Sequence, residues 1–274
     1  MAFGGENAES YYDEGLTAVM KGDIKRAIEF FMHAIKLDSS FIMAYHQLGR
    51  CFLRIGQTER AVHVLQQVLA RKPTLIPARI DLGYALLQHG NIPEARAQFS
   101  QVVQVQADSS KGHLGLAHVE FQMGNWSQAT ALAQAARNLG SASFAVLFLL
   151  GKAARLAGDY ALSDSALKEA LAQIEKSVEL NPDAPEGYYL RGEIGFVQER
   201  YIEALDSYRA AESTTAADAS YSAFGENFTR IEVLVKEGLC MQRMGDKEPA
   251  RAIGARILTL SPGHKLGQAL SELK

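Results

Sequence analysis

The fold is decided by one stretch, from Ile42 to Leu75, which reads IMAYHQLGRCFLRIGQTERAVHVLQQVLARKPTL. Its apolar residues recur every three or four positions in two separate runs, which is the spacing of two amphipathic helices. Gly56 falls between the runs and can end the first helix in a left-handed conformation. Pro73 ends the second run because proline cannot continue a helix. The stretch therefore predicts a helical hairpin, with the small residues Gly49 and Ala61 where the two helices cross.

The same pattern returns when the frame is shifted by 34 residues, since the small residue at the crossing recurs at Gly15, Gly49, Gly83 and Ala117. A single hairpin cannot bury its apolar faces, so stacked neighbours must supply the partner surface. Seven units can be placed in this way, at 8–41, 42–75, 76–109, 110–143, 144–184, 185–218 and 231–264. We expect an insertion at 219–230 and a capping helix at 265–274, so that one solenoid spans 1–274.

A family resemblance rests on the spaced residues of the reference unit. They give Y-x2-L-G-x2-F, then A-x3-L, then P, at Tyr45, Leu48, Gly49, Phe52, Ala61, Leu65 and Pro73. This series resembles the tetratricopeptide repeat, whose signature is W-x2-L-G-x2-Y, then A-x3-F, then P. The resemblance implies an all-α fold without a sheet. It would be a right-handed superhelical solenoid of about seven helix-turn-helix repeats and about fifteen helices.

Four places depart from the plain repeat. The fifth unit carries seven extra residues without proline or glycine, which predicts one long second helix from Tyr160 to Leu180. The insertion 219–230 is either a packed loop or an early start of the next helix, and we favour a helix kinked near Gly225. Glu120 occupies an aromatic slot of the fourth unit. Gly254 stands where the pattern has a bulky residue, which predicts a loose core in the last unit.

Composition narrows the class of protein. The 274 residues are 47% hydrophobic and 22% charged with a net charge of −3, which is ordinary for a soluble protein and gives no support for general nucleic-acid binding. We expect no signal peptide, because the N-terminal residues MAFGGENAES have neither a basic region nor an apolar region. The longest apolar run, Phe144–Leu150, is far short of the ~18 residues that suggest a membrane span. Cys51 and Cys240 fit small buried slots, so we expect a cytoplasmic protein.

Motifs for catalysis are missing from the sequence. It has no phosphate-binding glycine loop, no G-x-G-x-x-G, no H-E-x-x-H and no C-x-x-C. His113 and His118 are five residues apart on a predicted helix, which is a poor spacing for a shared metal. Because seven repeats fill the chain, we expect no enzyme, no cofactor and no metal.

The resemblance implies a working surface, because in that family the first helix of each repeat lines a concave groove. Carried over to this chain, the groove positions that we select for peptide binding are Tyr12, His46, Arg50, Arg54, Tyr84, Lys111, His118, Phe121, Phe148, Lys152, Arg155 and Tyr189. Units two to five place five cations and no carboxylate on the groove positions, whereas units six and seven place three carboxylates and one arginine there. We therefore expect a partner protein segment that carries both acidic and apolar side chains.

Other functions stay open at the level of sequence. The chain could be a self-assembling structural protein, an assembly chaperone of a larger complex or the regulatory part of a longer enzyme, and it could form homo-oligomers. One subtype is disfavoured. The clamp that holds the C-terminal carboxylate of heat-shock chaperones uses Lys, Asn, Asn, Lys and Arg, and the matching residues here are Tyr12, Leu16, Gln47, Pro77 and Asp81.

Overall fold

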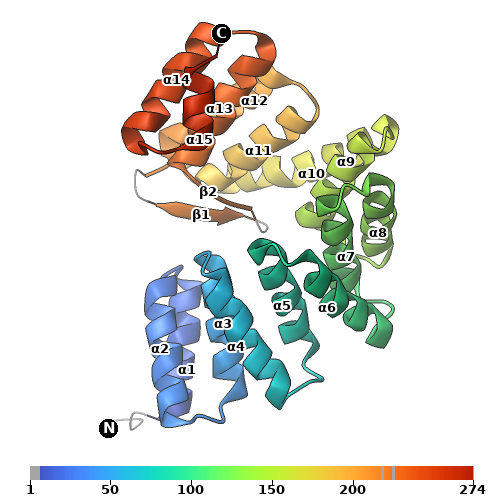
Figure 1. Cartoon of the computed structure of the whole chain (residues 1–274), viewed down its shortest axis with the longest axis vertical. Helices are drawn as coiled ribbons and strands as arrows, with labels where there is room; N and C mark the ends of the chain where they lie inside the picture. Colours follow the sequence, from blue (N-terminus) through green and yellow to red (C-terminus); the bar gives the residue numbers. More distant parts are fainter. Residues whose placement is uncertain (1–6, 217–218, 224–225, 274) are drawn as a thin grey trace. The chain divides into compact units, whose positions relative to one another are not determined.

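The computed structural model describes residues 7–216, 219–223 and 226–273. Fifteen helices and one two-stranded antiparallel hairpin make up its described part (Figure 1). The helices are α1 (Ala8–Met20), α2 (Ile24–Leu37), α3 (Ile42–Arg54), α4 (Thr58–Arg71), α5 (Ile76–His89), α6 (Ile92–Val105), α7 (Ser110–Gln122), α8 (Trp126–Asn138), α9 (Phe144–Leu156), α10 (Tyr160–Leu180), α11 (Pro185–Val197), α12 (Tyr201–Thr214), α13 (Arg230–Met244), α14 (Lys247–Leu260) and α15 (Lys265–Ser271). The strands are β1 (Ser220–Ala223) and β2 (Glu226–Thr229).

The expected helical repeat solenoid is confirmed, and its elements fall into two compact units. Unit 1 is Met1–Ser141 and unit 2 is Ala142–Lys274. Unit 1 holds four antiparallel hairpins, from α1/α2 to α7/α8, and unit 2 holds α9/α10, α11/α12, the strand hairpin, α13/α14 and α15 (Figure 1). The expectation of one solenoid domain over the whole chain stays a prediction.

The reference hairpin of unit 1 crosses where the sequence predicts. A Cβ atom placed on Gly49 of α3 would lie 2.8 Å from Cγ of Leu65 on α4, which is closer than real side chains approach. Ala61 is completely buried beside this contact. Gly56 has a φ of +72° in the turn between the helices, so it takes the left-handed conformation that glycine adopts at least cost.

Glu120 shows how unit 1 accommodates an acid in an aromatic slot. Its side chain is almost fully buried on α7, and its Oε1 lies 2.9 Å from Nη2 of Arg96 on α6. Asn125 donates a second contact from Nδ2 to Oε2 at 2.7 Å. A buried carboxylate is tolerated only when it is paired and hydrogen-bonded, so these two partners explain the departure from the repeat pattern.

Unit 2 begins with the long second helix. Helix α10 runs from Tyr160 to Leu180, which confirms the predicted extension. Asp159 caps its N-terminus, since the Asp159 side chain accepts a hydrogen bond from the backbone of Leu162 at 3.0 Å. Ala166, Ala170 and Ile174 face the core of the unit.

The insertion contradicts the expectation of an early helix and of a fold without a sheet. Residues 220–223 and 226–229 pair as antiparallel strands, with Tyr221 directly opposite Phe228, and Gly225 lies outside the described residues. Helix α13 begins only after Thr229. A capping box fixes that start. The Thr229 side chain accepts a hydrogen bond from the backbone in the first turn of α13, and the Glu232 side chain accepts one from the backbone of Thr229. The T-x-x-E spacing of these two residues is visible in the sequence, and our interpretation overlooked it.

The last repeat is tightly packed rather than loose. A Cβ atom on Gly254 would lie 2.5 Å from the backbone nitrogen of Ser271 and 2.8 Å from the backbone oxygen of Gly267. The backbone of α15 therefore occupies the space that a bulky residue holds in the average repeat. Leu270 of α15 is buried, and its Cδ1 would lie 2.5 Å from a Cβ atom on Gly238 of α13, whereas Leu266 is exposed.

In the part of the chain that the structure describes, none of the helices is both long enough and apolar enough to cross a membrane.

Candidate functional site

The first groove lies in unit 1 and is lined by the first helices of three successive repeats. Its volume is about 400 Å³. Helix α3 contributes His46 and Arg50, α5 contributes its N-terminal turns, and α7 contributes Lys111. The structure therefore brings together three of the residues that the sequence selects, two from the second repeat and one from the fourth.

A carboxylate, Asp81, sits among these cations and corrects the charge expected for this surface. Oδ2 of Asp81 lies 2.8 Å from Nε2 of His46 and 3.7 Å from Nε of Arg50. The Arg50 side chain remains about half exposed and also donates to Oε1 of Gln47 at 3.1 Å. Lys111 is exposed at the rim. The groove is thus cationic at its edge but partly neutralised at its floor.

His46, Asp81 and Ser109 all line the groove, and together they are the residue types of a hydrolytic triad. The geometry does not support a proton relay. His46 is 4% exposed, and its Nδ1 is buried without a hydrogen-bond partner among the described residues. Oγ of Ser109 accepts a hydrogen bond from the backbone of Gly112 at 3.2 Å and so caps α7. We interpret the three residues as structural.

The aromatic residues selected in unit 1 are half buried and pack within their own neighbourhoods. The ring centroid of Tyr84 lies 5.0 Å from Phe99 and 5.9 Å from His118, and the ring of Phe121 lies 5.0 Å from Trp126. Burial raises the pKa of Tyr84 far above its usual value, and the charge of Asp81 adds to this. These rings act at least partly as packing.

Tyr84, His118 and Phe121 are not part of the lining of this groove, and two further residues from the sequence selection also lie outside it. Tyr12 packs against Phe31 and Phe41, with ring centroids 5.7 and 4.9 Å away. Arg54 is exposed at the end of α3.

A larger groove lies in unit 2, with a volume of about 610 Å³. It is again lined by first helices of successive repeats, here α9, α11 and α13, with additions from the starts of α10 and α12. The lining residues are Lys152, Arg155, Leu156, Tyr160, Glu193, Phe196, Val197, Glu199, Tyr201, Lys236 and Arg243. Lys152 and Arg155 from the sequence selection therefore share one site.

Glu193 forms the polar floor of the unit 2 groove. Oε1 of Glu193 accepts a hydrogen bond from the Tyr208 hydroxyl at 2.7 Å and lies 2.6 Å from Nζ of Lys236. Burial, followed by the charge of Glu193, raises the pKa of Tyr208 well above its usual value. Because the carboxylate already has two internal partners, it repels an incoming anion much less than its formal charge suggests.

Arg155 is also held by acids of its own unit. Its guanidinium lies 3.6 Å from Oδ1 of Asp164 and 3.7 Å from Oε1 of Glu199, and it sits over the ring of Tyr160 at 5.3 Å. Arg243 is exposed on α13 and has no ion pair among the described residues. Arg243 is therefore the cation of this groove with the least internal compensation.

Phe148 and Tyr189 are core residues of unit 2 rather than open anchors. Phe148 stacks on Phe144 with ring centroids 5.2 Å apart, and Lys152 places Nζ 4.9 Å from the Phe148 ring. Tyr189 is 4% exposed and is stacked face to face on Phe228 of β2, with centroids 4.0 Å apart. The hairpin thus covers the groove position that Tyr189 occupies.

The sequence interpretation missed Lys236, Tyr160 and Tyr201. Lys236 is absent from the groove positions carried over from the family, and only the fold brings it to Glu193, 43 residues earlier in the chain. Tyr160 and Tyr201 are each the first residue of a second helix, α10 and α12. That shared position is a signal that the sequence offered.

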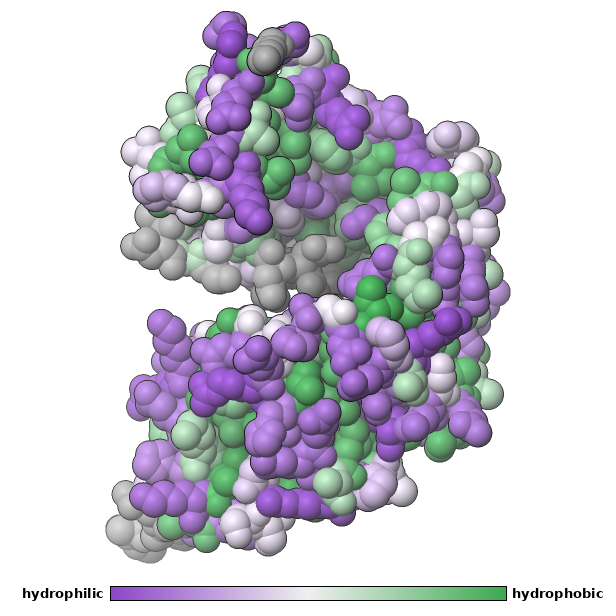
Figure 2. Space-filling model, viewed as in Figure 1, coloured by the Kyte–Doolittle hydropathy of each residue, from purple (hydrophilic) through white to green (hydrophobic). Residues whose placement is uncertain are grey.

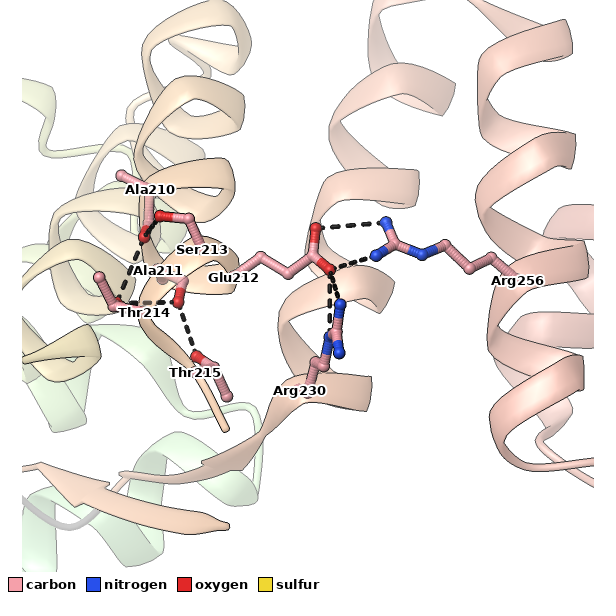
Figure 3. A network of polar contacts seen from close by, with 8 residues as sticks. All are labelled: Ala210, Ala211, Glu212, Ser213, Thr214, Thr215, Arg230 and Arg256. Carbon is pink, nitrogen blue, oxygen red and sulfur yellow. Dashed lines mark hydrogen bonds and ion pairs between the residues drawn. The ribbon is translucent and has the colours of Figure 1, made fainter. Parts of the chain in front are cut away.

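A separate polar network holds the second helices of unit 2 to α13. Glu212 of α12 accepts hydrogen bonds from Nε and Nη2 of Arg230 at 3.1 and 2.9 Å and from Nη1 of Arg256 at 3.2 Å (Figure 3). Glu237 lies buried nearby, and burial raises its pKa to about 7. This network ties three helices together and does not line the groove.

Figure 2 shows polar residues over much of the face that it draws, with apolar residues between them. Among the described residues, no group of three or more His, Cys, Asp and Glu side chains could hold a metal ion.

Comparison with solved structures supports the repeat architecture. A tetratricopeptide repeat protein from Parabacteroides merdae ATCC 43184 has a TM-score of 0.63 at 13% identity and covers 97% of this chain and 98% of that chain. The APC/C hetero-tetramer Cut9–Hcn1 has a TM-score of 0.62 at 15% identity, over 90% of this chain and 45% of that chain. MamA from Desulfovibrio magneticus RS-1 has a TM-score of 0.53 at 18% identity, over 63% of this chain and 97% of that chain. At these identities the likeness shows the fold alone.

Family models address the sequence directly. No curated protein matches this sequence significantly. Models of the tetratricopeptide repeat match residues 8–41, 56–113, 114–164 and 165–221, which together make up most of the chain. With the helical hairpins described above, these matches establish that the chain belongs to the tetratricopeptide repeat family.

Proposed function

We propose that this chain is a non-enzymatic scaffold that binds segments of partner proteins on the first helices of its repeats. One observation carries the proposal: each unit has an open groove lined by three successive first helices, α3, α5 and α7 in unit 1 and α9, α11 and α13 in unit 2. A surface of this kind is a natural site for an extended or helical segment, because side chains from several repeats can contact it at once.

The chemistry of the grooves favours a segment with both acidic and apolar side chains. The unit 2 groove has four cations in its lining and two carboxylates, and Glu193 and Glu199 are already engaged by Lys236 and Arg155. Tyr160, Phe196 and Tyr201 add aromatic surface. Complementary charge speeds the encounter and rejects basic segments, whereas buried aromatic contacts supply most of the lasting affinity.

Selection from a displayed library of random peptides tests the unit 2 groove. We expect the whole chain to enrich peptides that combine Asp or Glu with large apolar residues. Arg243→Glu should weaken binding of the enriched peptides by about tenfold or more, because it replaces an attraction by a repulsion in the lining of the groove. The matched control is Lys168→Glu, which makes the same charge change on the exposed face of α10. Equal binding by the two variants would remove the unit 2 groove from the proposal.

The unit 1 surface is tested by Arg50→Glu, which changes a residue that lines the groove, combined with Arg54→Glu, which changes an exposed residue next to it at the end of α3. These residues are four apart on α3 and project from one face. The double variant should weaken binding of peptides selected by unit 1 and reduce the salt dependence of that binding. The control is Lys25→Glu combined with Lys36→Glu, two exposed positions on the second helix α2. Undiminished binding by the α3 variant would show that partners use another surface.

A further inference from the structure

We infer that unit 2 recognises a short motif, a side-chain carboxylate next to one large apolar side chain, because the strand hairpin fills the remainder of its groove. The inference rests on the proposed scaffold function and makes the partner more specific. It departs from the picture of a long segment lying along several repeats.

The hairpin fills the groove at the level of Tyr189 on α11. Phe228 of β2 lies parallel to the Tyr189 ring, with centroids 4.0 Å apart and an interplanar angle of 7°. Tyr221 of β1 stacks on Phe228 as well, with the two ring centroids 5.4 Å apart. Phe228 is 1% exposed. An aromatic side chain of the protein itself therefore occupies the place where a partner would contact Tyr189.

The strand hairpin is held in place by contacts at both of its ends and does not act as a movable lid. The Thr229–Glu232 capping box joins the end of β2 directly to α13, and the hydroxyl of Tyr221 accepts a hydrogen bond from the backbone of Ala216 at 2.9 Å. Phe228 belongs to the same buried cluster as Val233 and Leu234 of α13. Displacing the hairpin would expose this cluster, so bound partners must use the space that remains.

The remaining space lies toward the C-terminal ends of α9 and α11 and along α13. Its lining comes from residues 152–156, 193–197 and 236–243, with Tyr160 and Tyr201 beside them. A volume of about 610 Å³ falls within the range of pockets that hold small ligands, about 300–1,000 Å³. The space accepts a few side chains of a segment, whereas its continuation past Tyr189 is closed.

The walls of this space divide into an apolar part and a cationic part. Phe196 packs edge-on against Tyr201 with centroids 5.5 Å apart, and Leu156 and Val197 line the same side. Lys152, Lys236 and Arg243 line the cationic part. Lys236 is engaged by Glu193, and Lys152 lies over the ring of Phe148, so the cationic part has capacity for one more carboxylate near Arg243 rather than for a run of acids. The partner is therefore a protein segment with one carboxylate adjacent to one large apolar residue.

Fluorescence anisotropy on the whole chain tests the inference with two labelled peptides. Both are acetylated and amidated, so that the carboxylate comes from a side chain. One has the six residues Gly-Ser-Asp-Phe-Ser-Gly, and the other places the same Asp-Phe pair within sixteen residues of Gly and Ser. We expect dissociation constants within about threefold of each other, and a loss of about tenfold or more when Asp becomes Asn or Phe becomes Ala. Arg243→Glu should abolish the difference between Asp and Asn, whereas Lys168→Glu should retain it.

The hairpin is tested in the same complex by hydrogen exchange, which needs no substitution in the core. The backbone of 220–223 and 226–229 should keep its protection when the six-residue peptide is bound. Increased exchange there would show that the hairpin is displaced, and it would overturn the inference. The inference also fails if library-selected long peptides bind but lose affinity more than about tenfold when trimmed to their acidic–apolar core, although the scaffold function then stands. If the library yields no binding peptide and neither probe binds, both proposals fail.

Discussion

Glu237 is a carboxyl group in the interior of unit 2, where Oε1 has no hydrogen-bond partner among the described residues. Burial raises its pKa from the ordinary 4.5 to about 7, the charge of Glu212 adds to the rise, and Arg209 and Arg256 reduce it. Because the pKa is higher in the folded state, the folded protein binds the proton more tightly. The stabilisation from this proton is fully present below about pH 4.5 and is lost as the pH rises through about 7.

Replacement of this acid by its neutral isostere should therefore stabilise the protein at high pH. We expect Glu237→Gln to raise the free energy of unfolding at pH 8 by on the order of 2–3 kcal/mol and to change it little at pH 4.5. Urea unfolding followed by circular dichroism at the two pH values measures this. Glu175→Gln, on the exposed face of α10, should show no such pH-dependent gain. An equal gain at both pH values would mean that Glu237 is not the titrating group.

The close approach at Gly49 makes a second prediction for a single residue. Any side chain there meets Leu65, whose Cγ would lie 2.8 Å from the new Cβ. Gly49→Leu should cost about 1–3 kcal/mol, because overpacking forces neighbours out of their preferred rotamers. Gln66→Leu adds the same side chain at an exposed position of α4 and serves as the control. Equal melting temperatures of the two variants would show that the crossing tolerates the added volume.

The strand hairpin and the helix that follows it behave as one element, since the capping box closes the boundary between them. The backbone nitrogen of Thr229 donates to Oε2 of Glu232 at 2.8 Å, and Oγ1 of Thr229 accepts from the backbone of Ile231 at 3.2 Å. We expect Thr229→Ala to destabilise unit 2 by about 0.5–2 kcal/mol, as loss of an N-cap does elsewhere. Thr229→Ser preserves the hydroxyl and should retain most of the stability in the same thermal denaturation experiment. If serine is as harmful as alanine, the methyl group and not the cap is responsible.

Sequence reasoning predicted elements well where a local rule decides them. The long helix Tyr160–Leu180 follows from an uninterrupted helical segment, and the hairpin crossings follow from the recurrence of small residues such as Gly49. It was wrong at the insertion because the aromatic residues 221, 224 and 228 follow one another at three- and four-residue spacing, which is the spacing of a helix face. It was also wrong at Gly254, because the space there is filled by the backbone of α15, which no local pattern reveals.

The candidate site was predictable to a smaller extent. Repeat positions located Arg50 and Lys111 in one groove and Lys152 and Arg155 in another. Charge compensation was not predictable, because the pairs His46–Asp81 and Glu193–Lys236 join residues 35 and 43 positions apart. Such pairs depend on how repeats stack, and they change which charges a partner meets.

At the scale of the molecule, each unit has its own buried cluster. In unit 1 the cluster runs from Ala18 to Val119, and in unit 2 it runs from Phe144 to Leu270. Contacts in a repeat protein are made mainly between neighbours, so local damage should stay local. Hydrogen exchange of Gly49→Leu should therefore show increased opening in α1–α8 and little change in α11–α14. A uniform increase over all helices would show that the two clusters unfold as one cooperative system.

The close packing of the α15 backbone on Gly254 bears on whether molecules can stack end to end. The outer face of a terminal hairpin has the shape that inner hairpins use to hold a neighbour, so an uncovered face invites head-to-tail addition of another molecule. Because Gly254 lets the backbone of α15 lie so close, we expect α15 to cover the face of α14 that such an addition would use. Gly254→Leu should lift α15 and produce a larger, concentration-dependent species in sedimentation velocity, whereas Gly263→Ala, in an open turn, should not. The absence of a side chain at this one position would then be what prevents the molecules from stacking into a polymer.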